Sequence, residues 1–282
     1  MNVSASPIGR RLYWQRLAAI ERQIAGRLKV DPDVNPFRGL KRRFVVAHAP
    51  RVGSHLLCQG LLAHGAVVEE FFEVARIHNV SARKGFSKLQ QYCAWVLATY
   101  AQGGMFGVSG GVKALAPLAM TKEIPAFVSA WRFVHLTRQD IVRQAVSELI
   151  ARRTGAFKSS KSPAGVLAAD AYDPQRLKRL IDAALTVNAA WEGAFEVHGI
   201  EPLRLTYEAL AADPPAVAAT AAAFLGLDGP RVTEAAFLSP PLQRQATRLN
   251  DEWASRFREE NPAFCASREA ADFRPQQVRG VK

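Results

Sequence analysis

The stretch that decides the fold is FVVAHAPRVGSHLLC, residues 44–58. Its first part, 44–49, is a short apolar run of the kind found in strands that are buried on both faces. Residues 50–54 interrupt the run with proline and glycine, and residues 55–64 favour a helix. A strand, a glycine-containing loop and a helix in this order are typical of a parallel sheet, which binds ligands at the carboxyl ends of its strands.

The rest of the chain continues the alternation of strands and helices. The apolar pattern predicts strands at 133–137 and 203–207, a strand end at 106–108, and helices at 9–29, 87–100, 137–153, 174–198, 215–225 and 242–257. Because hairpin signals are scarce, we expect an α/β fold with a P-loop-like parallel sheet flanked by helices. We expect a basic N-terminal helix and linker at 1–43, a main domain at 44–262 and a loose tail at 263–282.

Composition sets limits on the class of protein. The chain has 282 residues, of which 49% are hydrophobic and 22% charged, so it can bury a sizeable core. It contains no apolar stretch long enough to span a membrane and no secretory leader at its N-terminus. Its three cysteines form no CxxC pair, which argues against a disulfide scaffold and a cysteine zinc site. We therefore expect a cytoplasmic protein.

Most of the positive charge lies near the N-terminus. Residues 1–43 hold ten Lys or Arg against three acidic residues, and so contribute +7 to the net charge of +12. The body is only mildly basic, so we expect a local anion site and no nucleic-acid partner. An apolar stripe in residues 9–29, from Leu17 to Leu28, has two interpretations. It binds an anionic surface, peripherally at the inner membrane, or, as we favour, it packs on the body and leaves a solvated basic face.

The loop after the first strand has the features of an anion site. Gly53 allows backbone N–H groups to turn toward an anion, and the following helix adds the positive end of its dipole. Arg51 can bind two oxygens at once, and Ser54 can donate a hydroxyl hydrogen bond. A structural turn before a helix explains such a loop at least as often. The loop lacks the GK[ST] ending of nucleoside-triphosphate loops and an acidic partner for magnesium, which disfavours a metal-dependent NTPase.

A second basic element follows the strand at 133–137. Arg138 comes directly after this strand, and Ser147 lies nine residues further on, within the next expected helix. An arginine at a strand end and a helix serine can together bind a second phosphate beside the first loop. Taken alone, they read as a surface arginine and a serine that bonds its own helix backbone.

Together these elements resemble the bacterial sulfotransferases typified by trehalose 2-sulfotransferase, a group that includes nodulation-factor-type carbohydrate sulfotransferases. The resemblance extends over about residues 44–260. The segments that carry it are APRVGSHLLC (49–58), EFF (70–72), LTRQD with QAVS and TG (136–155), EPLRLTYE through LG (201–226), and RQA with W and RFR (244–258). No single segment is decisive, but five in the family's order are hard to obtain by chance.

The resemblance implies a sulfotransferase-type sheet and a specific reaction. The donor would be 3′-phosphoadenosine-5′-phosphosulfate, the acceptor a sugar or glycolipid hydroxyl, and no metal would be needed. A homodimer is also implied. The implied donor-binding residues are Arg51, Gly53, Ser54, His55, Arg138, Ser147, Tyr207 at the adenine, and Arg244. The implied catalytic residues are Arg51 at the leaving phosphate and Glu70 as the base, with His55 as the second candidate base. His48 reads as a core histidine.

The chain departs from the family's pattern at several positions. Val52 and His55 replace hydroxyl residues of the loop, and Ser109 stands where the family has lysine, with Lys113 four residues later. Phe157-Lys158 stands where the family has an aromatic-His pair. These departures keep a second hypothesis open, a non-catalytic nucleotide-binding or scaffold protein on a sulfotransferase fold. A third, nucleic-acid binding through the basic N-terminal residues, predicts affinity that falls steeply with salt.

Overall fold

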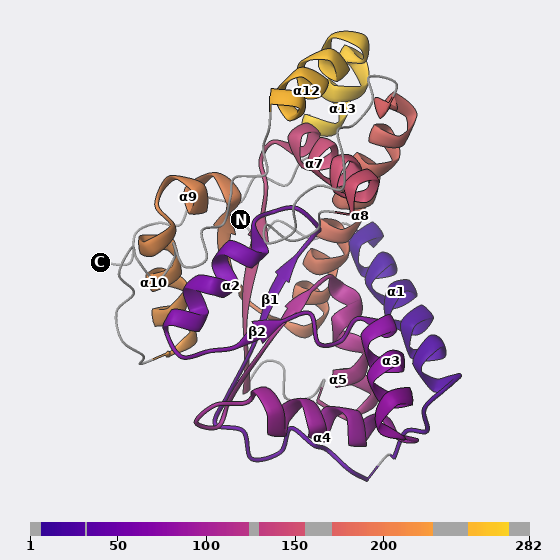
Figure 1. The fold of residues 1–282 in the computed structure, drawn as a ribbon, viewed down its shortest axis with the longest axis vertical. Coiled ribbons are helices and arrows are strands. Elements are labelled where there is room, and N and C mark those ends of the chain that lie inside the picture. Colours follow the sequence, from indigo (N-terminus) through magenta and orange to yellow (C-terminus); the bar gives the residue numbers. More distant parts are fainter. Residues whose placement is uncertain (1–6, 32, 124–129, 156–170, 228–247, 271–282) are drawn as a thin grey trace.

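The computed structural model describes residues 7–31, 33–123, 130–155, 171–227 and 248–270 (Figure 1). The described residues form a five-stranded sheet in the order β2-β3-β1-β4-β5 in which every pairing is parallel. The strands are β1 (Arg42–His48), β2 (Val68–Glu69), β3 (Met105–Gly110), β4 (Trp131–Thr137) and β5 (Leu203–Thr206). The predicted α/β class with a parallel sheet is therefore confirmed.

Strand β1 lies at the centre of the sheet and is buried on both faces. Phe44 and Val46 point into one hydrophobic core, whereas Val45 and Ala47 point into the other. This alternation follows from the two-residue period of a strand. It explains why an unbroken apolar run in the sequence marks the middle of the sheet.

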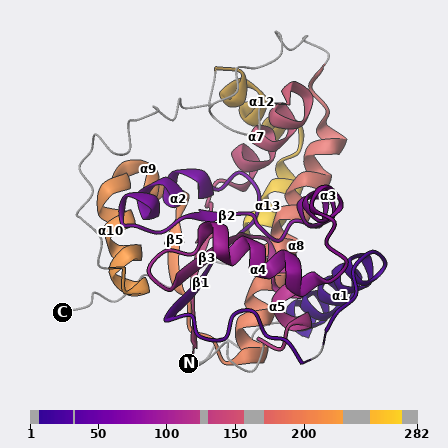
Figure 2. The ribbon, with the colours of Figure 1, turned by 60° about the horizontal axis from the view of Figure 1, so that its bottom comes forward.

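Helices cover both faces of the sheet. On one side lie α2 (Ser54–Ala63), α9 (Tyr207–Ala212) and α10 (Pro214–Leu225), and on the other α1 (Pro7–Ala25) and α8 (Pro174–His198), as Figures 1 and 2 show. The remaining described helices are α3 (Val74–Lys84), α4 (Leu89–Tyr100), the 3-10 helix η1 (Val112–Leu115), α5 (Ala116–Met120), α7 (Ile141–Thr154), α12 (Arg248–Glu260) and α13 (Pro262–Ala270). Of these, α7, α12 and α13 pack together at one end of the molecule.

Helix α8 has the boundaries that its sequence predicts. The side chain of Asp173 accepts a hydrogen bond from the backbone N–H of Arg176, and Pro174 occupies the first turn. Gly199 ends the helix at φ +60°, a left-handed conformation that favours glycine. A proline near the start and a glycine just past the end are the asymmetry expected of helix termini.

A buried ionic cluster joins α8 to the two strands beside it. The Glu192 carboxylate binds the Arg204 guanidinium through two hydrogen bonds and lies 3.0 Å from His135 Nδ1. Burial alone would raise the pKa of Glu192, but the hydrogen bonds from His135 and Arg204 hold that pKa below its ordinary value. The cluster therefore stabilises the packing of β4, β5 and α8 while Glu192 is ionised.

Helix α1 packs against α8. Leu17 and Ile24 of its apolar stripe are buried, and the backbones of Gly9 and Gly193 touch, because a Cβ added to Gly193 would lie 2.2 Å from the carbonyl carbon of Gly9. The stripe thus faces the body, in agreement with the favoured interpretation, and contact of residues 9–29 with a membrane stays a prediction. No helix in the described part of the chain is long and apolar enough to cross a bilayer.

The C-terminal region differs from its prediction. A loose tail was expected from residue 263, but this is wrong for 263–270, where helix α13 begins at Pro262 and buries Cys265. Proline blocks the continuation of a helix, yet it is well suited to the first helical position, where its missing N–H costs nothing. The first part of the helix predicted at 242–257 lies outside the described residues.

Candidate functional site

The candidate site lies at the carboxyl edge of the parallel sheet. The chain leaves β1 toward β2 on one side of the sheet and leaves β4 toward β5 on the other side. Such a reversal between neighbouring strands opens a crevice at their carboxyl ends, where parallel sheets bind ligands. Arg51 follows β1 and Arg138 follows β4, so the two arginines flank this point.

The loop between β1 and α2 is held in an unusual backbone conformation. Arg51 has φ +66° and Gly53 has φ +82°, both in the left-handed region. A Cβ added to Gly53 would lie 2.8 Å from Cδ2 of Tyr207, so glycine is required both by the backbone angle and by the neighbouring ring. Helix α2 begins at Ser54 without a side-chain cap. The positive N-terminal end of a helix attracts an anion.

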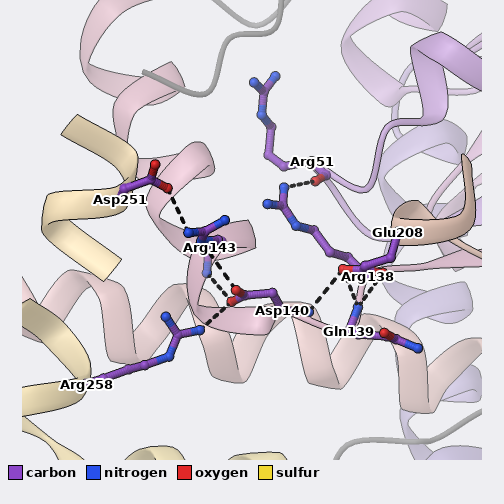
Figure 3. A network of polar contacts seen from close by, with 8 residues as sticks. All are labelled: Arg51, Arg138, Gln139, Asp140, Arg143, Glu208, Asp251 and Arg258. Atoms are coloured by element: carbon purple, nitrogen blue, oxygen red, sulfur yellow. Dashed lines mark hydrogen bonds and ion pairs between the residues drawn. The ribbon is translucent and has the colours of Figure 1, made fainter. Parts of the chain in front are cut away.

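The Arg138 guanidinium reaches the backbone of Arg51, whose own guanidinium points away from it (Figure 3). Arg138 Nη1 donates to the carbonyl oxygen of Arg51 at 3.4 Å (Figure 3). Arg51 Nε donates to Ser147 Oγ at 3.0 Å. The Arg138 guanidinium also lies 4.3 Å from the centre of the Tyr207 ring. The structure therefore brings together Arg51, Gly53, Arg138, Ser147 and Tyr207.

Both arginines are partly buried. Burial lowers the pKa of Arg51 and of Arg138 from the ordinary value. Nε of Arg138 is buried with no hydrogen-bond partner among the described residues. Two charged groups that have lost part of their hydration interact strongly with a bound anion, because little water screens them.

A polar network fixes the turn that carries Arg138. Glu208 accepts hydrogen bonds from the backbone N–H groups of Gln139, at 3.1 Å, and of Asp140, at 3.3 Å. The Asp140 side chain in turn accepts from Arg258 of α12 at 2.7 Å (Figure 3). Because these contacts join α7, α9 and α12, the position of Arg138 is determined by three elements.

A cavity of about 260 Å³ lies next to the loop. Its wall includes Pro50 from the loop and Gln144 from α7, and Gln144 Nε2 donates to the carbonyl oxygen of Pro50 at 2.7 Å. Glu70, directly after β2, lines the same cavity with about half of its side chain exposed. The cavity therefore places the candidate base beside the candidate donor loop.

His48 lines the same cavity as Glu70, and its hydrogen bonds fix one tautomer. Its Nδ1–H donates to the carbonyl oxygen of Ala49 at 2.9 Å, so Nε2 accepts from the Ser109 hydroxyl at 2.8 Å. Burial lowers the pKa of His48, which keeps the ring neutral. Although Nε2 lies 3.9 Å from Oε1 of Glu70, it has no proton to donate. The Glu70 carboxylate thus stays free to accept one.

The structure also shows where the departures from the family's pattern lie. Ser109 is buried against His48, and Lys113, four residues later, lines the cavity and pairs with Glu73 at 2.9 Å. A lysine is thus present in the cavity, but from η1 instead of from β3. Val52 is fully buried in the core, where its apolar side chain packs and no hydroxyl would be within reach of solvent.

Two of the predicted site residues do not join this arrangement. His55 is exposed in the first turn of α2 and is not among the residues that line the cavity. Arg244 lies outside the described residues, as does the Phe157-Lys158 pair. Within the described ranges, no three His, Cys, Asp or Glu side chains gather in a way that could hold a metal ion.

Sequence reasoning missed several residues of the cavity wall. Arg16 comes from α1, Glu148 and Arg152 come from α7, and the apolar side chains of Leu180 and Val187 come from α8. No motif marks these positions. Their convergence depends on how the helices pack, and the one available signal was their helical spacing.

Parts of the chain are similar to known proteins. Residues 112–260 match the family model described as Stf0 sulphotransferase. Two proteins named trehalose 2-sulfotransferase are similar, one from Mycobacterium tuberculosis (32% identity over 130 residues) and one from Mycolicibacterium smegmatis (30% over 125 residues). The matched segment spans 46% and 45% of those proteins, less than half of their length. A solved sulfotransferase from Alicyclobacillus acidocaldarius aligns with a TM-score of 0.46 and 16% identity, over 81% of this chain and 92% of that one.

Proposed function

Because this chain belongs to the Stf0 sulphotransferase family, we propose that it transfers a sulfuryl group from 3′-phosphoadenosine-5′-phosphosulfate to a hydroxyl group of a carbohydrate or glycolipid. One observation carries the proposal. At the carboxyl ends of β1 and β4, Arg51 bonds to Ser147 and Arg138 bonds to the backbone of Arg51, beside a cavity that Glu70 lines. The family match begins at residue 112, so Arg51 and Glu70 rest on this geometry and on the resemblance of their motifs.

The donor would bind with its two phosphate groups at two different places. The 5′-phosphosulfate lies on the loop of β1, where Gly53 and the first N–H groups of α2 face the anion and Arg51 supplies the charge. The 3′-phosphate lies between Arg138 and Ser147. Tyr207, whose ring packs on Gly53 and on Arg138, stacks against the adenine.

Sulfuryl transfer forms one bond to sulfur and breaks another. The acceptor oxygen attacks the sulfur in line with the bridging oxygen of the 5′-phosphate, and the leaving group is 3′-phosphoadenosine 5′-phosphate. Negative charge grows on the leaving phosphate, so the N–H groups of the loop and Arg51 stabilise the transition state more than the ground state. The sulfuryl group carries less charge than a phosphoryl group, and the reaction therefore needs no metal ion to neutralise it.

The acceptor hydroxyl must lose its proton during the attack. Glu70 takes this proton, because its carboxylate lines the cavity next to the donor loop and His48 does not donate to it. His55, the second candidate, is exposed at the start of α2 and lies outside the cavity wall. We therefore assign the base to Glu70.

The proposal extends to the oligomeric state and the cellular location of the protein. We propose a homodimer, which light scattering tests, and a cytoplasmic location. Cys58, Cys93 and Cys265 are free thiols, as a reducing compartment favours. Peripheral contact of residues 9–29 with the inner membrane would show as co-sedimentation with anionic vesicles.

The direct test is transfer of labelled sulfate. The purified full chain is incubated with ³⁵S-labelled donor and a panel of glycans and glycolipids, and products are separated from the donor. Labelled product from at least one acceptor supports the proposal. Tight binding of 3′-phosphoadenosine 5′-phosphate with no transfer to any hydroxyl would favour a non-catalytic nucleotide-binding protein instead.

A further inference from the structure

Helix α1 forms part of the wall of the acceptor cavity. Its backbone touches that of α8 at Gly9 and Gly193, Arg10 pairs with Glu196 at 2.8 Å, and the Tyr13 hydroxyl bonds to the His198 ring at 2.8 Å. Helix α8 also supplies much of the apolar part of the cavity wall, including Leu180 and Val187. Since α1 is fixed to α8 by backbone contact and two polar contacts, a side chain of α1 that reaches the cavity is held in place.

Arg16 is the side chain of α1 that reaches the cavity. It lies between Tyr13 and Leu17, which are both buried against the body, and it lines the same cavity as Glu70. Burial lowers its pKa, which indicates that water solvates the guanidinium incompletely. A partly desolvated cation is costly unless a partner of opposite charge is present.

The charges of the cavity wall leave Arg16 without such a partner. Lys113 pairs with Glu73 at 2.9 Å, and Arg152 pairs with Glu148 at 2.7 Å. Within the described part of the chain, the side chain of Arg16 makes no ion pair and no hydrogen bond. Among the acidic side chains of the wall, Glu70 is the one that has no Lys or Arg partner in those same residues. The cavity thus presents one carboxylate and one guanidinium to whatever enters it.

We infer that Arg16 binds an anionic group of the acceptor, and that the acceptor is an acidic sugar that carries a carboxylate, phosphate or sulfate substituent. This inference rests on the proposed function, in which Glu70 faces the hydroxyl to be sulfated. Arg16 then binds an oxyanion elsewhere on the same molecule, with the fork geometry that guanidinium groups offer to such oxygens. The apolar side chains of Leu180 and Val187 suit the C–H faces of a sugar ring.

The arrangement assigns a specificity role to a helix outside the matched family region, which begins at residue 112. The basic N-terminal residues therefore act on the acceptor through Arg16, whereas the other arginines of α1 are not among the residues that line the cavity. Arg11 is exposed on the same helix and provides a matched control, because its loss changes the net charge by the same amount.

The test measures binding and does not need transfer. Calorimetry with 3′-phosphoadenosine 5′-phosphate present compares a neutral disaccharide, the same disaccharide with one hydroxymethyl group oxidised to a carboxylate, and its phosphate and sulfate esters. The wild type should bind at least one anionic form about tenfold to a hundredfold more tightly than the neutral one, the range for a hydrogen bond to a charged group. Arg16→Gln should abolish this preference, Arg16→Lys should retain part of it, and Arg11→Gln should leave it unchanged.

Three results would overturn the inference: no preference in the wild type, a preference that survives in Arg16→Gln, or an equal loss in Arg11→Gln. Weaker nucleotide binding by Arg16→Gln, with sugar binding intact, would also overturn it, because Arg16 would then serve the donor. Thermal unfolding of each variant confirms that the fold is kept. A preference that depends on Arg16 in a protein that transfers no sulfate would support the inference and contradict the proposed function.

Discussion

Replacing Arg51 with alanine removes one guanidinium group from the candidate donor site and changes little else. At this position the backbone has φ +66°, and alanine bears the same steric cost there as arginine does. The substitution therefore isolates the side chain, which in the free protein donates to Ser147 Oγ at 3.0 Å. In the proposed complex its remaining nitrogens bind the 5′-phosphate.

The expected change in nucleotide affinity follows from the hydrogen bond that the 5′-phosphate loses. A hydrogen bond to a charged group contributes about 1.5–3 kcal/mol, which corresponds to roughly a tenfold to 150-fold change in Kd. Because Arg51 is half-buried and burial lowers its pKa, water screens the interaction less than it would at the surface. We therefore expect Arg51→Ala to weaken binding of 3′-phosphoadenosine 5′-phosphate within that range.

Calorimetry with this nucleotide measures the change directly. Arg51→Lys keeps the charge but loses the planar fork, so its affinity should lie between those of the wild type and Arg51→Ala. Arg83 is the matched control: it is exposed on α3, and its side chain donates to the carbonyl oxygen of Asn79 within its own helix. Arg83→Ala should bind as the wild type does. An unchanged Kd for Arg51→Ala in a folded protein would refute the placement of the 5′-phosphate.

Three further substitutions test other parts of the account. Glu70→Gln should leave nucleotide affinity intact and slow turnover by roughly 10²–10⁴-fold, and unaffected turnover would show that Glu70 is not the base. Glu192→Gln, which leaves Arg204 without its carboxylate, should lower the free energy of unfolding by about 3 kcal/mol in chemical denaturation. The pKa of Glu192 is held below its ordinary value of 4.5, so its ion pair contributes to the free energy of unfolding above that pH, and this contribution is lost as pH falls. The free energy of unfolding of the variant should therefore fall less steeply with acid than that of the wild type. Gly193→Ala should lower the melting temperature, with a cost of about 1–3 kcal/mol, because its Cβ would lie 2.2 Å from Gly9; an unchanged melting temperature would contradict the close contact of α1 and α8.

A helix or strand could be predicted from the sequence wherever its apolar pattern and its end residues match the way the element is buried. The run 44–49 marks β1 because a central parallel strand is buried on both faces. Helix α8 was predicted with its observed limits because Pro174 and Gly199 mark its two ends. In contrast, β2 consists of Val68–Glu69 alone, which is too short to show a period of two.

The site could be predicted only where chemistry is concentrated in one segment. Arg51 and Gly53 lie in a single loop, so one segment of the sequence predicts both of them. The meeting of Arg51 with Ser147 depends on the packing of α7 against the loop, where Gln144 bonds to Pro50. The cavity wall is built in the same way from helices that are far apart in the chain, and no pattern within a single segment encodes it.

The measurement that tests the central claim most directly is a crystal structure of the full chain with 3′-phosphoadenosine 5′-phosphate. The account predicts the 5′-phosphate on the N–H groups that follow Gly53, in contact with Arg51, and the 3′-phosphate between Arg138 and Ser147. Phosphate groups bound elsewhere, with these side chains left in contact only with one another, would contradict it.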